Sequence, residues 1–409
     1  MSLRSSQLAS RIASLALLAS LPSLGACGGD GGTPPPRGGG AALSVVGQGK
    51  ATDRYNAELS VRGDYAYTTT WGANTDRAVG NQLNVWNVAG STPSLVRSIT
   101  VADATTLGDV QVSDDGRLLV VATERTGGSI VVFDLADPAS PRQLSRFTSA
   151  NTTNGVHTAE VQRVNGTLYA FLSVDPLGTS SPSRLTVVDL SDPSNPREVL
   201  SRVMGNPFVH DVFVRDGILF TALWSDGLTI WDVGGAGRGG TPANPIQLGN
   251  VHTVGGDVHN VWWFHDPVTG SKRYAFVGEE GPASLFSRAS GDVHVVDVSD
   301  LANPREVAFY HVEGAGTHNF SMDEERGILY AAFYNAGVRA LDARGDLASC
   351  TAGQKDANGR CDLARMGREL ASGLTDRGPV FVWGVQREGS FVYASDMLNG
   401  IWKLNGASR

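Results

Sequence analysis

The sequence predicts an all-β fold: a single seven-bladed β-propeller of four-stranded blades over residues 41–409, closed by an N-terminal strand that completes the last blade. Three observations predict this architecture. A short apolar strand that ends in Asp or Asn recurs seven times at a spacing typical of propeller blades. The repeats hold four strand-like runs each. The last repeat lacks its fourth run, whereas a spare run precedes the first repeat.

The recurring strand alternates apolar residues and then meets a turn, which often contains Pro. The six intervals between Asn87 and Asn405 span 318 residues, an average of about 53, which fits a propeller blade better than a helical solenoid. The seven copies are Leu83–Asn87, Ile130–Asp134, Leu185–Asp189, Leu228–Asp232, Val293–Asp297, Val338–Asp342 and Ile401–Asn405.

The fourth copy illustrates the content of one period. Its apolar runs alternate with turns that contain Gly or Asp, which is the pattern of an antiparallel meander. The runs are His210–Val214, Ile218–Ala222, Leu228–Trp231 and a shorter one at Pro245–Leu248.

The two ends of the chain predict how the ring closes. After Asn405 only four residues remain, too few for the fourth strand of the seventh copy. The run Ala41–Val46 lies ahead of the first full repeat and has no other partner. Pairing this run with the last copy would complete the blade and cover an open sheet edge.

Three copies continue almost identically beyond the strand, as Leu135–Arg142, Leu190–Arg197 and Val298–Arg305. These phrases resemble the LVIVD-repeat β-propeller lipoprotein family of bacterial and archaeal cell-surface proteins. The first copy departs from the pattern, and the turn of the sixth is displaced by an insertion. The resemblance implies a propeller and a cell-surface location. It implies no chemistry, so the function has to be argued from the site.

The N-terminus predicts export and lipidation. Residues 1–26 carry Arg4 and Arg11, then a short apolar stretch, then small residues, as in a secretory signal peptide. Leu24-Gly25-Ala26-Cys27 resembles the lipobox of bacterial lipoproteins, which implies cleavage before Cys27 and lipid on its sulfur. The alternative is an ordinary signal peptide cut near Ala26.

Residues 27–40 after the cleavage site are rich in Gly and Pro and are expected to form a tether. Because Gly28, rather than Asp, follows the Cys, we expect delivery to the outer membrane, on its periplasmic or outer side. The lipid is the only membrane contact that the sequence predicts.

The other two cysteines, Cys350 and Cys361, flank a polar loop with an Asn-Gly turn. In an oxidising compartment they are expected to form a disulfide, with two free thiols as the alternative.

The formal net charge of −8, without a basic run, excludes a nucleic-acid partner. We expect an envelope protein or a small ligand instead, bound on one face of the propeller.

Polar residues recur where the first strand of each blade would enter the central channel. Candidate metal ligands are His157, His210, His259 and His318, with Glu279 from a loop on the same face. Candidate ligand-binding residues are Glu58, Asp109, Glu160, Asp211, Trp71 and Trp224, and loops of the same face add Glu124, Asp175, Glu280 and Asp396.

Two interpretations of these residues stay open. The polar side chains either bond neighbouring blades to one another or converge on a transition-metal ion, the only cofactor that the sequence suggests. His252, His265, His294 and His311 fall elsewhere and are expected to be surface or packing residues.

The expected function is a binding or scaffolding propeller of the cell envelope. The alternative is a metal-dependent periplasmic enzyme that uses the histidine cluster. No residue is assigned a catalytic role, because no nucleophile elbow, phosphate loop or His-Glu-x-x-His motif occurs in the sequence.

Overall fold

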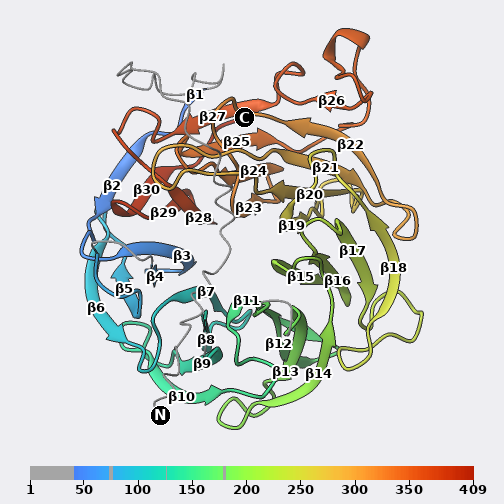
Figure 1. Ribbon diagram of the computed structural model, residues 1–409. Helices are drawn as coiled ribbons and strands as arrows, with labels where there is room; N and C mark the ends of the chain where they lie inside the picture. Colours follow the sequence, from blue (N-terminus) through green and yellow to red (C-terminus); the bar gives the residue numbers. More distant parts are fainter. Residues whose placement is uncertain (1–40, 73–76, 126, 178–180) are drawn as a thin grey trace, which may run out of the picture.

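Seven four-stranded antiparallel sheets form a closed ring in the computed structural model (Figure 1), which describes residues 41–72, 77–125, 127–177 and 181–409. The predicted all-β propeller is thereby confirmed. The predicted signal peptide, Cys27 and the tether lie outside the described residues. Within those residues no helix is both long and apolar enough to cross a membrane.

Each of the first six blades is a meander whose first strand faces the central axis and whose last strand lies at the rim (Figure 1). Blades one to three are β3 (Tyr55–Arg62), β4 (Tyr65–Trp71), β5 (Gln82–Asn87) and β6 (Ser94–Thr100); β7 (Leu107–Val112), β8 (Leu118–Thr123), β9 (Ser129–Asp134) and β10 (Arg142–Phe147); and β11 (Val156–Val164), β12 (Thr167–Val174), β13 (Arg184–Asp189) and β14 (Arg197–Val203).

Blades four to six follow the same order along the chain. They are β15 (Asp211–Arg215), β16 (Ile218–Ala222), β17 (Leu228–Asp232) and β18 (Ile246–Val251); β19 (Val258–Trp263), β20 (Tyr274–Glu279), β21 (Val293–Asp297) and β22 (Arg305–Tyr310); and β23 (Phe320–Asp323), β24 (Ile328–Ala332), β25 (Val338–Asp342) and β27 (Glu369–Gly373).

The seventh blade joins the two ends of the chain. It consists of β28 (Val382–Glu388), β29 (Phe391–Asp396), β30 (Gly400–Asn405) and β2 (Val45–Gly49), which pairs antiparallel with β30. Closure by an N-terminal strand is thus confirmed, with different bounds from Ala41–Val46. The pairing continues to Gly49, and β1 (Ala41–Ala42) pairs instead in parallel with β27 of blade six.

Two glycines explain why the closing strand lies later in the chain than predicted. A side chain on Gly47 would place its Cβ 2.3 Å from the Ser91 carbonyl oxygen, and one on Gly49 would meet the ring of Trp86 at 2.7 Å. Both residues therefore allow β2 to lie close against blade one. Leu43, between β1 and β2, is buried in the core shared by blades six and seven.

The chemistry that recurs in the repeat turn is a carboxylate that accepts a backbone N–H group. Asp189 Oδ1 accepts the N–H of Ser191 at 2.8 Å, and its other oxygen accepts a bond from Arg197 at 3.2 Å. Asp134 with Arg142 and Asp297 with Arg305 repeat the arrangement. The strand-ending Asp and the later Arg thus fix the connection between the two outer strands of a blade.

An insertion in blade six reaches across to blade five. It contains the 3₁₀ helix η1 (Ala352–Gln354) and β26 (Cys361–Asp362), which pairs in parallel with β22. The predicted disulfide between Cys350 and Cys361 is present, with a Cα–Cα distance of 6.0 Å. The bridge closes the loop that carries β26 to its partner.

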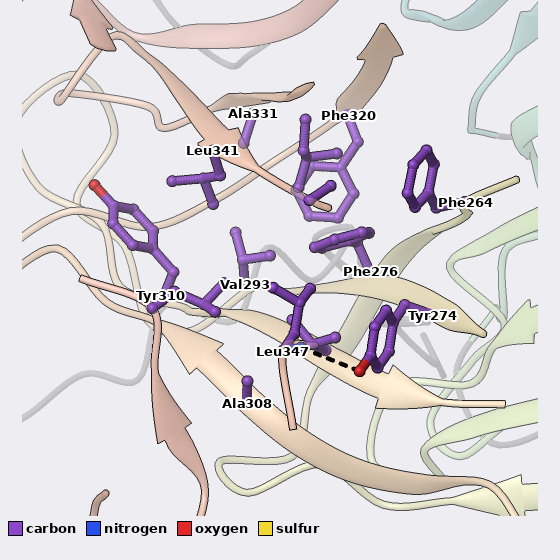
Figure 2. Close-up of a cluster of buried hydrophobic side chains, with 14 of the residues drawn as sticks. Phe264, Tyr274, Phe276, Val293, Ala308, Tyr310, Phe320, Ala331, Leu341 and Leu347 are labelled. Carbon is purple, nitrogen blue, oxygen red and sulfur yellow. Dashed lines mark hydrogen bonds between the residues drawn. The ribbon is translucent and has the colours of Figure 1, made fainter. Parts of the chain in front are cut away.

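The hydrophobic core lies between adjacent blades. Figure 2 shows the cluster shared by blades five and six, where Phe276 and Val293 meet Phe320 and Leu341. The hydroxyl of Tyr274 accepts the N–H of Leu347 at 3.1 Å at its edge. Similar clusters between other blades hold the ring rigid around its axis.

Candidate functional site

A cavity of about 1710 Å³ follows the central channel. Residues of all seven inner strands line it, namely those of β3, β7, β11, β15, β19, β23 and β28. Loops of one face surround its mouth, with Trp71, Phe208, Trp224 and Tyr334 among the lining residues. This volume is that of an open channel and exceeds the roughly 300–1,000 Å³ of a typical small-molecule site, whereas aromatic residues such as those at the mouth commonly line such sites.

Each blade has one equivalent position at the start of its first strand, and in most blades the backbone pairing is irregular there. In five blades the pairing of the first two strands slips at this point, as between Val156 and Thr158 or between Val258 and Asn260. Such bulges redirect a side chain. The residues at the equivalent position in the seven blades are Ala57, Gly108, His157, His210, His259, His318 and Trp383, and in blades four and six the pairing stays regular.

The four histidines form an arc of contacting rings on four consecutive blades, which we call the histidine arc (His157, His210, His259 and His318). Successive ring centroids are 4.3, 4.0 and 4.3 Å apart. The ring of His318 also stacks on Trp383 at 5.0 Å. The structure therefore brings together the four histidines that the repeat position selects.

Glu280 is the carboxylate at the centre of the histidine arc. Its Oε2 lies 3.9 Å from Nε2 of His210 and 3.9 Å from Nε2 of His259. Its Oε1 accepts a hydrogen bond of 2.5 Å from the hydroxyl of Tyr334. These contacts hold the carboxylate in one orientation beside the two imidazoles.

Glu279, the carboxylate expected here, is elsewhere. Its Oε2 lies 3.0 Å from Nε2 of His294, which is fully buried in blade five. Glu279 ends β20 and Glu280 follows it, and consecutive residues of a strand point to opposite sides. Glu280 consequently takes the position at the arc that the sequence analysis gave to its neighbour.

A second carboxylate group surrounds His157 at the end of the arc. Its Nδ1 lies 3.4 Å from Asp175, and Glu124 completes the group. Burial opposes protonation of His157, but Glu124 and Asp175 outweigh it and raise the pKa of this imidazole to about 10. His157 is therefore a cation, and its Nε2 lies 3.0 Å from Nε2 of His210 as the donor.

The other three histidines of the arc are neutral. Burial lowers their pKa values well below 6.5, and neighbouring imidazoles lower them further. His318 donates its Nδ1–H to the Trp383 carbonyl at 3.0 Å, which leaves Nε2 as its lone-pair nitrogen. His210 Nδ1 and both ring nitrogens of His259 are buried without a hydrogen-bond partner among the described residues.

The acidic candidates line the channel and bond one blade to the next. Asn319 of blade six donates to Glu58 of blade one at 2.7 Å, across Gly384 of blade seven, which has no side chain to intervene. Asp109 accepts the N–H of Ala159 at 3.1 Å, and Glu160 accepts a bond of 3.0 Å from Gln111. These contacts fit the interpretation in which channel carboxylates join blades.

Burial leaves these carboxylates weakly acidic. It raises the pKa of Glu58 and of Glu160 to about 8 and that of Asp211 to about 7, with nearby carboxylates adding to the rise. The part of the channel that these carboxylates line therefore carries less negative charge at neutral pH than its composition indicates.

Both candidate tryptophans lie at the mouth. Trp224 stacks on Phe208 at 5.0 Å and on His210 at 5.3 Å, and Trp71 meets Trp383 edge-on at 5.5 Å. Asp396, from the same face, is instead fully buried and accepts a bond from the indole N–H of Trp402. It belongs to the framework of blade seven.

Two mouth aromatics adopt a strained backbone. Trp224 has φ 55° and Tyr334 has φ 34°, in equivalent turns between the second and third strands of blades four and six. Left-handed backbone is costly for bulky residues and is concentrated at functional sites. Sequence reasoning missed Tyr334 and Phe208, since neither residue stands at the repeat position of the histidines.

The comparisons with known proteins agree with the fold. A family model described as "LVIVD repeat" matches residues 182–203 and 289–312, which cover the outer strands of blades three and five. No curated protein sequence matches this chain.

Three solved structures similar to this chain show the fold alone, because their identities are low. The Saccharomyces cerevisiae Sqt1 structure is 9% identical, covers 89% of this chain and 86% of its own, and has a TM-score of 0.54. The RRP9 WD40 repeats are 12% identical over 91% and 99%, with a TM-score of 0.59. U3-55K is 13% identical over 90% and 97%, with a TM-score of 0.57. The chain is a seven-bladed β-propeller that contains LVIVD repeats.

Proposed function

We propose that this protein is a ligand-binding propeller of the cell envelope, anchored by lipid on Cys27, and that the channel mouth is its binding site. The observation that carries the proposal is the cavity of about 1710 Å³ whose mouth presents Trp224 and Tyr334 on strained backbone. A rigid ring of blades and an aromatic rim suit a small ligand. Strained backbone is concentrated at functional sites, which favours a functional role for both turns.

A metal-dependent enzyme is the second candidate function. Two neutral imidazoles and one carboxylate, from His210, His259 and Glu280, are a donor set that catalytic metal sites use. Turnover would require a reacting group beside such a metal, and no residue at the mouth is assigned that role. Binding is therefore the function that the geometry supports better.

Ligand binding is tested by native mass spectrometry of the full-length protein, solubilised from its own cell envelope. We expect the wild type to retain a small molecule that Trp224→Ala loses, because the indole forms one wall of the mouth. Val268→Ala is the matched control, since Val268 is 69% exposed and lies outside the cavity lining. Equal retention by wild type and Trp224→Ala, or no bound molecule in either, would contradict the proposal.

Anchoring is tested separately with Cys27→Ala. We expect this variant to lose labelling by radioactive palmitate and to leave the membrane fraction, because the sequence predicts no other membrane contact. Ser5→Ala, within the predicted signal peptide, should change neither result. Cys27→Ala that stays with the membranes would show that another element anchors the protein.

A further inference from the structure

We infer that a first-row divalent transition-metal ion binds at the channel mouth between His210, His259 and Glu280. This inference rests on the proposed binding site and names the chemical class of one of its ligands. It is carried by the separation of three donor atoms, by their chemistry, and by buried ring nitrogens that lack partners.

The donor atoms are spaced closely enough for one ion. One atom from each of the three residues lies within 4.8 Å of the others, and both Nε2–Oε2 distances are 3.9 Å. Ligands placed 2.0–2.2 Å from a tetrahedral ion lie about 3.4 Å apart. The two Nε2–Oε2 distances would therefore have to shorten by roughly half an ångström, which is within the range of side-chain rotation.

The chemistry of the donors selects the kind of ion. Two imidazoles and a carboxylate suit zinc, iron or copper, whereas calcium and magnesium prefer oxygen donors alone. Three protein ligands leave a coordination position open, and the cavity borders all three residues. A water molecule or an anionic group of a small ligand would fill that position.

His259 is the strongest single indication. It is 1% exposed, and neither of its ring nitrogens has a hydrogen-bond partner among the described residues. Buried polar atoms without partners are rare in folded proteins because each costs free energy. An ion at Nε2 would satisfy this unpaired atom.

Neighbouring side chains already orient the proposed ligands. Tyr334 holds the second oxygen of Glu280, which is the kind of support that metal-bound carboxylates receive. The stacked ring of Trp224 restrains the imidazole of His210. Nε2 of His210 forms a hydrogen bond with Nε2 of His157, which the ion would displace.

The other nearby group, Glu124, His157 and Asp175, does not carry the same inference. Nδ1 of His157 lies 3.4 Å from Asp175, so this imidazole already contacts a carboxylate of its own group. No atom of these three residues is buried without a partner in the described part of the chain. The two groups therefore have different roles at the mouth.

The test uses the full-length protein in detergent, without a histidine tag, stripped with a chelator and dialysed against Zn²⁺ or Co²⁺. We expect one ion per chain by elemental analysis, visible absorption bands with Co²⁺, and no competition from excess Ca²⁺ or Mg²⁺. His259→Ala and Glu280→Gln should each weaken Zn²⁺ binding at least about 100-fold, since they remove direct ligands. Tyr334→Phe should weaken it about 10-fold. His252→Ala removes an exposed histidine away from the cavity and should bind like the wild type.

The inference is overturned if the wild-type protein takes up less than half an ion per chain. It is also overturned if the Glu280→Gln variant binds Zn²⁺ as tightly as the wild type. Because Gln has nearly the shape of Glu, this variant decides the matter even where His259→Ala fails to fold. The two proposals fail separately. If the protein binds no metal but retains a small molecule that depends on Trp224, only the metal site is overturned. If it binds the metal but retains no such small molecule, only the wider ligand-binding function is overturned.

Discussion

Deleting residues 41–49 is expected to destabilise the propeller by about 4 kcal/mol or more. The deletion removes β2, which pairs with β30 from Val45 to Gly49, and the side chain of Leu43, which is 4% exposed. Burial of one Leu side chain contributes about 1.5–3 kcal/mol, and the lost strand also uncovers apolar surface on blade seven. The exposed edge of β30 should promote association between molecules.

Differential scanning calorimetry of the purified proteins measures the effect. Deleting only Ala41 and Ala42 is the matched control, since both side chains are exposed and β1 only extends the edge of blade six. This shorter deletion should change the melting temperature little. If the deletion of residues 41–49 melts at the wild-type temperature, β2 does not close the ring.

Replacing His294 with Gln is expected to cost about 3 kcal/mol of stability at pH 6 and much less at pH 10. His294 is fully buried between Glu306, 2.7 Å from Nδ1, and Glu279, 3.0 Å from Nε2. Burial opposes its protonation, but the two carboxylates outweigh burial and raise its pKa to about 9. A cation is thus held between two anions.

The direction of the pH effect follows from the two pKa values of His294. A pKa raised from 6.5 to about 9 on folding adds stability that is complete below pH 6.5 and is lost as the pH rises through 9. Urea unfolding of wild type and His294→Gln at pH 6, 8 and 10 measures the difference between their free energies of unfolding. The contributions of titrating groups that the two proteins share cancel in this difference. His252→Gln, at an exposed histidine, serves as control. A difference that stays constant across this range would mean that His294 is not charged in the folded protein.

The fold was predictable because each repeat contains the residues that determine the local structure of one blade. The strand-ending Asp fixes the turn, as Asp189 does, and the equivalent position at the start of each inner strand placed His157, His210, His259 and His318 around one axis. Repetition turns a weak local signal into a strong one, since seven copies have to satisfy the same packing.

Three features were not predictable from the pattern. The closing strand extends through Gly47 and Gly49, which carry no apolar signal and serve for close approach to blade one. The choice between Glu279 and Glu280 depends on which side of the strand end faces the channel. The left-handed backbone of Tyr334 depends on its turn and leaves no mark in composition.

The most direct test of the binding site is anomalous X-ray scattering from crystals of the protein soaked in Zn²⁺, collected above and below the zinc absorption edge. Our account predicts a peak at the channel mouth about 2.0–2.2 Å from Nε2 of His210, Nε2 of His259 and a carboxylate oxygen of Glu280. A crystal soaked in excess Zn²⁺ that shows no anomalous peak at coordination distance from these three residues would contradict this account.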